Sequence, residues 1–481
     1  MNCRLSIFIL CAALLVPGAS RLDELPAPEQ AAIDRISADT MRGDLSFLAS
    51  DALEGRATPS RGLDIAAEFI ASRFRAAGLE PVTKDGSYFQ KAPFAEVTPK
   101  LDDFHLTLQA GREKIELTSA DVRIHTTRPL DLKNVDVVNL PPNGNPPPVE
   151  DKVVAGDAKR YGNEAALRRL QALRPALILL LGSLRGPEEP HPFLEEADSN
   201  RAPVIRVGNG DAASALSENR RLIASLHLSA PVRRDVMLEN VAGILRGSDP
   251  VLRDHYVLLT AHYDHVGMLN SVSGAVNSGA DRIYNGANDN SSGVVSVTEI
   301  ASALGTLNPH PRRSIVFMTF FGEEEGLLGS SFYVRHPLVP LKETVANVNL
   351  EQMGRTDDKD GPEVGAFAFT GPSYSDLPAR MTAPARIEGV KVYNHRGADD
   401  FFDRSDNYAF AQAGIVAHTI AVAFEFPDYH AVGDEWQKID YANLAKVDRA
   451  VAAGLLDLAD ADAPPRWSNT KEAQPYREAG R

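Results

Sequence analysis

The spacing of apolar residues changes along the 481-residue chain. Between residues 35 and 80 the spacing is helical, with Ile65, Phe69, Ile70 and Phe74 on one face and Gly78 as a C-terminal stop. The sequence from about 95 to 235 instead has short apolar runs, at 104–108, 135–140, 177–181 and 204–207, between turn-rich connections. Such runs are typical of strands, so we expect a separate, strand-rich domain in this part of the chain.

From residue 240 onward, strand-like and helix-like segments alternate. The continuous apolar run 256–261 is typical of a strand covered on both faces, and the runs 314–321, 346–350 and 414–420 predict three further central strands. Residues 294–304 have helical spacing, and Ser291 and Ser292 are candidate N-caps. The alternation predicts an α/β fold, with a mixed, mostly parallel central sheet flanked by helices and a smaller strand-rich inserted domain.

The first 20 residues have the pattern of a signal peptide. Arg4 precedes the apolar run 7–16, and the small residues Gly18, Ala19 and Ser20 follow it. The run is about half of the roughly 20 residues that a spanning helix needs, so we expect export to the periplasm or the cell exterior, without a stable membrane anchor. Lipoprotein attachment at Cys11 is an alternative, but the preceding Leu10 is not the small residue expected there.

Composition narrows the choice of partners and ligands. The formal charge of −15 is spread without long runs of like charge, which argues against nucleic acid as a partner. The only cysteines, Cys3 and Cys11, lie in the predicted signal peptide. A metal in the mature chain must therefore be held by His, Asp and Glu side chains.

Polar residues with metal-ligand chemistry follow the predicted central strands. They are His262, Glu323, Glu324, Glu351 and His430, joined by Asp289 in the loop ahead of the predicted helix 294–304. Ligands of open α/β sheets bind at the carboxyl ends of the strands, so we expect these side chains to lie in one site. Imidazoles and carboxylates together are typical ligands of a divalent metal.

The number of these side chains favours two ions. Each zinc takes about four ligands, so five protein ligands can hold two ions if one carboxylate, which we take to be Asp289, bridges them. Of the adjacent Glu323 and Glu324, one would be a ligand and the other a base, and spacing alone leaves the choice open. We expect Asp264 to hold the free imidazole nitrogen of His262.

Each of these features has a simpler explanation when it is taken alone. The triplet 323–325 could be a solvated helix start, Asp289 could cap a helix, and His430 could be an ordinary surface or core residue. Their joint occurrence at successive strand ends favours the metal site. By the same reasoning we expect His265 and His418 to be structural.

Six segments carry a family resemblance: AHYDHVG (261–267), NGANDNSSG (285–293), GEEEGLLGS (322–330), NVNLEQMGR (347–355), RSDNYAF (404–410) and DYH (428–430). With them the chain resembles the co-catalytic zinc aminopeptidases of the secreted leucine-aminopeptidase type, which are related to glutamate carboxypeptidase II and glutaminyl cyclase. The resemblance implies two Zn²⁺ ions, one held by His262, Asp289 and Glu351 and the other by Asp289, Glu324 and His430. It implies that Glu323 is the proton acceptor and makes Tyr429 a candidate to support the substrate carbonyl.

The resemblance also implies a division of the chain. After the signal peptide 1–20, residues 21–94 and 236–463 would form the peptidase domain, and residues 95–235 an inserted domain that resembles protease-associated domains in 149–182. Residues 464–481 are mostly polar and are expected to form a loosely held tail.

The function implied is that of an exported exopeptidase that hydrolyses N-terminal residues from peptide substrates. A carboxypeptidase or dipeptidase could use the same site. Two other classes occur on this fold, a cyclising acyl transferase of the glutaminyl-cyclase type with one zinc and a non-catalytic, receptor-like protein that has lost metal ligands. The sequence leaves the preferred terminal residue and the oligomeric state open.

Overall fold

The computed structural model describes residues 24–162, 164–182, 192–197, 201–268 and 281–480. The signal peptide predicted for residues 1–20 lies outside them. Among these residues, no helix combines the length and the apolar character that crossing a bilayer requires.

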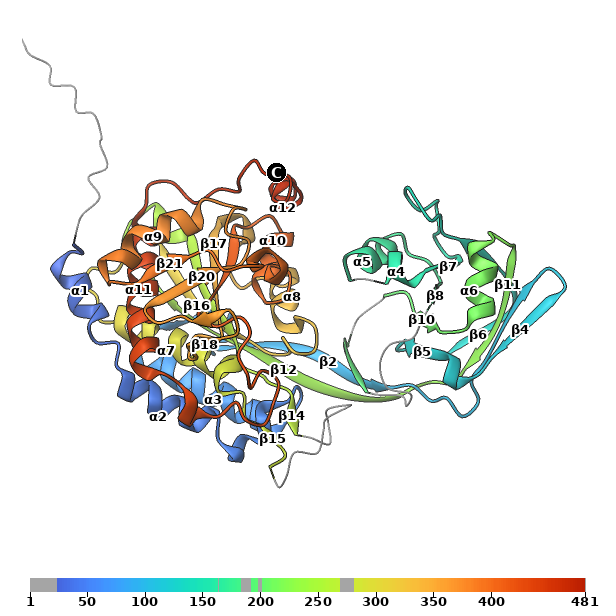
Figure 1. Cartoon of the computed structure of the whole chain (residues 1–481), viewed down its shortest axis with the longest axis horizontal. Helices are drawn as coiled ribbons and strands as arrows, with labels where there is room; N and C mark the ends of the chain where they lie inside the picture. Colours follow the sequence, from blue (N-terminus) through green and yellow to red (C-terminus); the bar gives the residue numbers. More distant parts are fainter. Residues whose placement is uncertain (1–23, 163, 183–191, 198–200, 269–280, 481) are drawn as a thin grey trace, which may run out of the picture.

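Within the described residues, a mixed ten-stranded sheet forms the centre of the larger lobe (Figure 1). Four adjacent parallel strands in its middle coincide with the four apolar runs predicted from residue 256 onward. In order across the sheet they are β22 (Ala417–Ala421), β17 (Thr344–Glu351), β13 (Tyr256–His262) and β16 (Ser314–Phe320). Every residue of β13, β16 and β22 is buried, because helices cover both faces of the sheet. The predicted α/β fold is confirmed.

Toward its edges the sheet becomes mainly antiparallel. Beyond β16 follow β12 (Val232–Leu245), β2 (Phe89–Thr98) and β9 (Phe193–Glu196), and β1 (Glu80–Pro81) also pairs with β12. Beyond β22 lie β20 (Ala366–Phe369), which is antiparallel to β22, and β21 (Lys391–Tyr393), which is parallel to β20. Apart from the β20–β21 pair at one edge, parallel pairing is found among the four central strands whose ends meet at the predicted site.

Two helical layers pack on the sheet. Successive side chains of β13 point to opposite faces of the sheet. Val257 and Leu259 pack in the core under one layer, and Tyr256 and Leu258 pack in the core under the other. Helices of the first layer are α1 (Ala27–Ile33), α2 (Ala38–Leu48), α3 (Arg61–Ala76), α7 (Gly293–Leu304), α9 (Leu377–Ile387) and α11 (Tyr441–Asp460). Helices of the second layer are α8 (Leu328–Arg335) and α10 (Asn407–Gln412).

The helix predictions are confirmed except for one cap. Helix α3 buries Ile70 and Phe74 and is followed by Gly78 in a left-handed conformation, φ +75°. Ser292 precedes α7, but its φ and ψ of −63° and −44° are helical and its hydroxyl donates to the carbonyl of Asn288 at 2.7 Å. Ser292 therefore occupies the predicted N-cap position, but its side chain makes no capping bond to α7.

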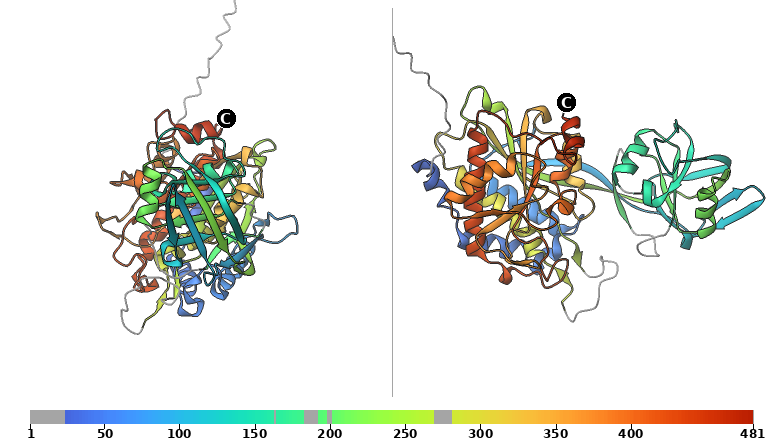
Figure 2. Two further views of the ribbon diagram at one scale, coloured as in Figure 1. Left: turned by 90° about the vertical axis from the view of Figure 1, so that its right-hand side faces the viewer. Right: turned by 45° about the horizontal axis from the view of Figure 1, so that its top comes forward.

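A second sheet, eight-stranded within the described residues, forms a smaller lobe inside the range 95–235 (Figures 1 and 2). Its strands are β3 (His105–Ala110), β4 (Glu113–Leu117), β5 (Val122–His125), β6 (Leu130–Asn139), β7 (Val153–Asp157), β8 (Leu177–Leu181), β10 (Val204–Val207) and β11 (Leu222–Leu228). Its helices are α4 (Ala158–Tyr161), α5 (Glu164–Ala172) and α6 (Gly210–Ser217). Two clusters of buried residues, on the two faces of this sheet, give the lobe its own core.

The two lobes are joined by the antiparallel ribbon of β2 and β12 (Figure 1). Thr98 and Val232, where the ribbon meets the smaller lobe, are direct partners in its register. Strand β9 returns from the smaller lobe to pair with β2, and Glu196 in β9 forms an ion pair with Arg335 of α8.

The prediction of a loosely held tail is wrong. The indole nitrogen of Trp467 donates to the carbonyl of Gly414 at 2.9 Å. Trp467 and Tyr476, in α12 (Gln474–Ala479), pack against the ring of Phe402. Two aromatic side chains anchor this segment although most of its residues are polar.

We expect residues 99–231 to be removable. Joining Thr98 to Val232 through Asn-Gly should close a tight hairpin, because these residues are already paired. The main core cluster of the larger lobe loses only the partly buried Leu194. The free energy of unfolding should therefore fall by no more than about 2 kcal/mol relative to the full chain. Cooperative thermal unfolding followed by circular dichroism, with the full chain as reference, would measure this. An insoluble or non-cooperative product would contradict it.

Candidate metal centre and active site

The parallel strands bring the predicted residues to one edge of the sheet. His262 and Glu351 are the last residues of β13 and β17. Glu323 and Glu324 follow β16 after Gly322, and His430 lies in the loop after β22. Neighbouring parallel strands end at the same edge, which explains how residues far apart in sequence meet.

The first group of side chains consists of His262, Asp289 and Glu351. The Nε2 atom of His262 lies 3.3 Å from Oδ1 of Asp289 and 3.1 Å from Oε1 of Glu351. The side chains of His262 and Asp289 are 1% and 4% exposed, so these polar groups lie in a largely dry environment. They are the three residues expected around one metal.

The second group contains Asp289, Glu324 and His430, and His265 in addition. The Nε2 atom of His430 lies 3.1 Å from Oδ2 of Asp289 and 3.2 Å from Oε2 of Glu324. Asp289 thus presents one oxygen to each group. His265 was expected to be only structural, but its Nδ1 lies 2.8 Å from Oε1 of Glu324. The spacing of His262 and His265 was the one sequence signal that could have drawn attention to it.

The donor distances fit a zinc-like ion in either group. In both groups the histidine nitrogen lies 3.1–3.3 Å from the nearest carboxylate oxygens. Ligands bound about 2.0–2.1 Å from a tetrahedral zinc are about 3.3 Å from one another. Imidazole nitrogen and carboxylate oxygen are also the atom types that zinc takes in proteins without thiolate ligands.

The electrostatics of the two histidines show how strongly this region attracts positive charge. Burial lowers the pKa of His262, but the carboxylates of Glu351 and Glu323 outweigh burial and hold that pKa well above its ordinary value. For His430, burial also lowers the pKa, and hydrogen bonds to two carboxylates raise it to about 10. Metal ligands bind in their deprotonated forms, so a divalent cation would take the place of these protons.

Asp434 fixes the loop that carries Asp289. Its carboxylate accepts the N–H groups of Asn288 and Asp289, each at 3.0 Å, and its own carbonyl accepts the N–H of Ala287 at 3.1 Å. Burial raises the pKa of Asp434 to about 6, although these N–H groups oppose the rise. Asp434 was not predicted, because hydrogen bonds to backbone N–H groups leave no spacing pattern in a sequence.

Two asparagines of the same loop join it to the end of β17. The side chain of Asn290 donates to the carbonyl of Leu350 at 2.9 Å, and Oδ1 of Asn288 accepts the N–H of Gly354 at 2.8 Å. These bonds lie on both sides of Glu351. They fix the position of Glu351 relative to Asp289, the other carboxylate of the first group.

A chain of buried hydrogen bonds orients the Glu351 carboxylate. The hydroxyl of Ser405 donates to its Oε2 at 2.6 Å and accepts a bond from Nδ2 of Asn349 at 2.9 Å. Oδ1 of Asn349 accepts from the hydroxyl of Thr260 in β13 at 2.8 Å. One oxygen of Glu351 is thus held through the sheet while the other faces His262.

Asp264 acts mainly on Glu323 rather than on His262. The Nδ1 atom of His262 is nearer to the backbone carbonyl of Asp264, at 3.2 Å, than to its carboxylate, at 3.5 Å. That carboxylate accepts the N–H of Glu323 at 3.1 Å and the hydroxyl of Thr58 at 3.2 Å. The expected contact through the Asp264 side chain is therefore largely replaced by its backbone oxygen.

A fully buried arginine next to the site is hydrogen-bonded to several of the surrounding loops. Arg56, 1% exposed, donates to the carbonyls of Leu48, Tyr263, Asn285 and Gly286. Burial lowers its pKa to about 10, so it stays cationic at neutral pH beside the buried carboxylates. Its partners are carbonyls of distant loops, which is why sequence patterns did not reveal its role.

A pocket opens beside the two groups. It has an open volume of about 620 Å³ and is lined by Asp289, Glu323 and Glu351 together with the rings of Phe401 and Phe424. Glu323 belongs to neither donor group, and burial raises its pKa well above the ordinary value.

Two other predictions concern Tyr429 and His418. Tyr429 also lines the pocket, is 40% exposed, and stacks on His430 with ring centroids 4.1 Å apart. His418 is a satisfied core residue, as predicted, because its ring contacts the hydroxyl of Ser375 at 2.6 Å and the carbonyl of Thr370 at 2.7 Å.

Comparison with known proteins agrees with this geometry. Residues 240–455 match peptidase family M28. The chain is 27% identical over 270 residues to aminopeptidase YwaD of Bacillus subtilis, covering 55% of this chain and 53% of that protein. It is 29% identical over 273 residues to a probable zinc metalloprotease of Pyrenophora tritici-repentis, covering 48% of this chain and 53% of that protein. The alignments thus span about half the length of these curated relatives.

A solved structure shares the fold. The aminopeptidase from Aneurinibacillus sp. strain AM-1 superposes with a TM-score of 0.53 at 19% identity, over 92% of this chain and 97% of that one. The family match covers every residue of both donor groups. The match to peptidase family M28 therefore includes the whole candidate metal centre.

Proposed function

We propose that this protein is an exported, zinc-dependent exopeptidase that removes N-terminal residues from peptides. The observation that carries the proposal is the position of Asp289 between two donor groups whose spacing fits zinc. The printed names of the relatives, aminopeptidase and zinc metalloprotease, support the same activity. Export rests on the signal-peptide pattern of residues 1–20.

The proposed site holds two Zn²⁺ ions. His262, Asp289 and Glu351 would bind one, and Asp289, Glu324 and His430 the other. Bound zinc lowers the pKa of a water toward about 7 and polarises the substrate carbonyl. His265, through its contact with Glu324, would keep that carboxylate in place.

Glu323 is the proposed general base. Its carboxylate lines the pocket with Asp289 and Glu351 but is not needed by either donor group. In the proposed reaction it accepts the proton of the attacking water and delivers it to the leaving amine. A raised pKa suits both steps, because proton transfer is most effective when the pKa lies near the working pH.

The charge of the pocket favours recognition of an amino terminus. Its lining includes the carboxylates of Asp289, Glu323, Glu351 and Glu425, against the single guanidinium of Arg404. Zinc would occupy Asp289 and Glu351, which leaves Glu425 and the base Glu323 as the lining carboxylates that could attract a protonated amine. The rings of Phe401 and Phe424 offer an apolar wall for the side chain of the terminal residue.

Replacing Glu323 by Gln should abolish turnover while leaving the metal bound. We expect kcat to fall by about 10²–10⁴, the usual contribution of a general base. The measurements are hydrolysis of an aminoacyl p-nitroanilide and zinc content by mass spectrometry. Glu325→Gln, the same change at an exposed neighbour, is the matched control. Retained turnover in Glu323→Gln would refute the assignment of the base.

Asp289 should be required for both metal ions. We expect Asp289→Asn to lose zinc from both groups and His430→Ala to lose it only from the second, because Asp289 is shared by the two groups. Zinc bound per chain after dialysis would distinguish the variants. Equal loss in the two variants would show that Asp289 does not bridge.

Peptides with a blocked amino terminus should not be cleaved. A free amine would be held by the carboxylates of the pocket, so N-acetylation should lower kcat/KM by at least about tenfold, the effect of losing one charged hydrogen bond. Chelation should abolish cleavage of the unblocked peptide. Equal cleavage of free and acetylated peptides, or cleavage confined to the carboxyl end, would overturn the aminopeptidase proposal.

A further inference from the structure

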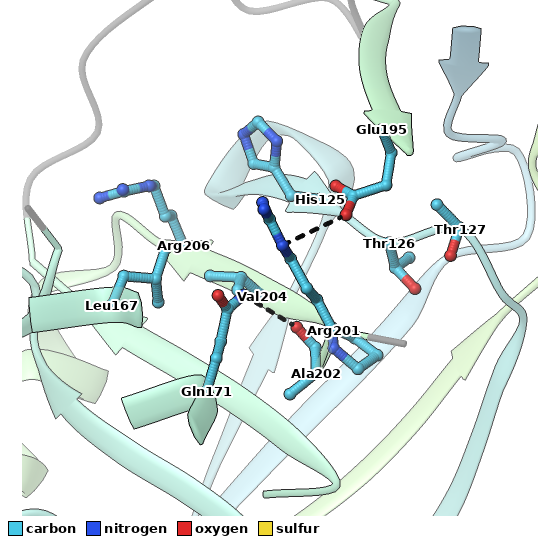
Figure 3. A pocket seen from close by; sticks show the side chains of 11 residues that line it. His125, Thr126, Thr127, Leu167, Gln171, Glu195, Arg201, Ala202, Val204 and Arg206 are labelled. Atoms are coloured by element: carbon cyan, nitrogen blue, oxygen red, sulfur yellow. Dashed lines mark hydrogen bonds and ion pairs between the residues drawn. The ribbon is translucent and has the colours of Figure 1, made fainter. Parts of the chain in front are cut away.

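The smaller lobe contains a second pocket that is separate from the metal centre (Figure 3). It has an open volume of about 760 Å³ and lies between the end of β5, helix α5 and the start of β10. Strand β9, which is paired with the sheet of the larger lobe, contributes Glu195 to its wall. The pocket therefore lies where the two lobes meet.

Arg206 supplies positive charge to this pocket. Its side chain is partly buried, and one guanidinium nitrogen donates to the carbonyl of Gly162 at 2.8 Å. Among the residues that the structure describes, Arg206 has no carboxylate partner. A guanidinium has five N–H donors, so this single bond leaves capacity for a ligand.

The backbone at residue 162 is shaped around this guanidinium. A β-carbon at Gly162 would come within 2.7 Å of Nη1 of Arg206 and 2.3 Å of the carbonyl oxygen of Ala158. Any larger residue would displace the arginine or the backbone. The absence of a side chain at Gly162 therefore leaves room for the guanidinium of Arg206 beside the pocket.

Among the lining residues that the structure describes, the side chains sum to one net positive charge. The Nε atom of Arg201 lies 3.7 Å from Oε1 of Glu195, so these two charges offset each other. Burial and the nearby Arg206 lower the pKa of His125, which leaves its imidazole neutral at pH 7. A single carboxylate matches the remaining charge, whereas a phosphate monoester carries about −1.5 to −2.

Other groups suit the remainder of a peptide-like ligand. Leu167 and Val204 offer apolar contact, and Gln171 and Thr127 offer amide and hydroxyl groups. In Figure 3, Leu167 lies beside Arg206, and Thr127 lies on the far side of Arg201.

A smaller recess lies next to this pocket, between β9 and the larger lobe. Its open volume is about 360 Å³, and it shares Glu195 and Arg201 with the pocket. Gly326 and Leu328, which follow Glu323 closely in the chain, line its other side.

We propose that this pocket binds a carboxylate group through Arg206. The carboxylate is that of a peptide C-terminus or of a small organic acid, and a guanidinium recognises either through paired N–H donors. Only the peptide source rests on the proposed peptidase function. The site itself needs neither metal nor catalysis.

Binding to the full-length, chelator-treated protein tests the proposal without hydrolysis. The probes for calorimetry are an N-acetylated hexapeptide with a free C-terminal carboxylate, the same peptide as its C-terminal amide, and succinate. We expect the free acid to bind at least about tenfold more tightly than the amide, because a charged hydrogen bond is lost in the amide.

Variants locate the site. Arg206→Gln should reduce the affinity for the free acid to that for the amide, whereas Arg112→Gln, the same change at an exposed residue of the β3–β4 turn, should leave it unchanged. If Arg206→Gln fails to fold, as judged by thermal unfolding, Arg206→Lys serves instead. Lys keeps the charge but not the paired donors, so it should weaken binding while preserving the preference for the free acid.

The outcomes separate the possibilities. Displacement of the peptide by succinate at similar concentration would support the carboxylate site with a small acid as its ligand. Failure of succinate to compete, together with the free-acid preference, would support the peptide. Equal binding of free acid and amide, or undiminished binding by folded Arg206→Gln, would overturn the proposal.

Discussion

The gathering of buried carboxylates at one edge of the sheet is the constraint on which the rest of the structure depends. Burying charge is costly unless it is paired and hydrogen-bonded, and seven acids crowd this edge. They are Asp264, Asp289, Glu323, Glu324, Glu351, Asp406 and Asp434. Part of that negative charge is offset by Arg56, by backbone N–H groups and by the histidines His262, His265 and His430. The remainder makes the edge a strong attractor for divalent cations.

Residues far from the ligands share this task. Arg56 ties four carbonyls of separate segments together, so one buried cation both offsets charge and holds the loops. Asp434 and Asn290 fix the backbone on either side of Asp289. The positions of the donor atoms are consequently set by hydrogen bonds made before any ion arrives, which reduces the conformational cost of binding one.

The central strands and the residues at their ends could be predicted because both leave local patterns. A buried parallel strand is a continuous apolar run, and His262 or Glu351 directly follows such a run. Arg56, Asp434 and Ser405 could not be found in this way, because their partners are backbone groups or side chains far away in sequence. The same limit explains the tail, where a few aromatic contacts outweigh a polar composition.

The ribbon between the lobes is mechanically part of the sheet that holds the metal centre. Strand β12 runs without interruption from its pairing with β2 into its pairing with β16, the strand that ends just before Glu323 and Glu324. A rotation of the smaller lobe therefore acts as torque on a strand hydrogen-bonded to β16. The ribbon that carries the smaller lobe is thus hydrogen-bonded directly to the strand that precedes the proposed base, Glu323.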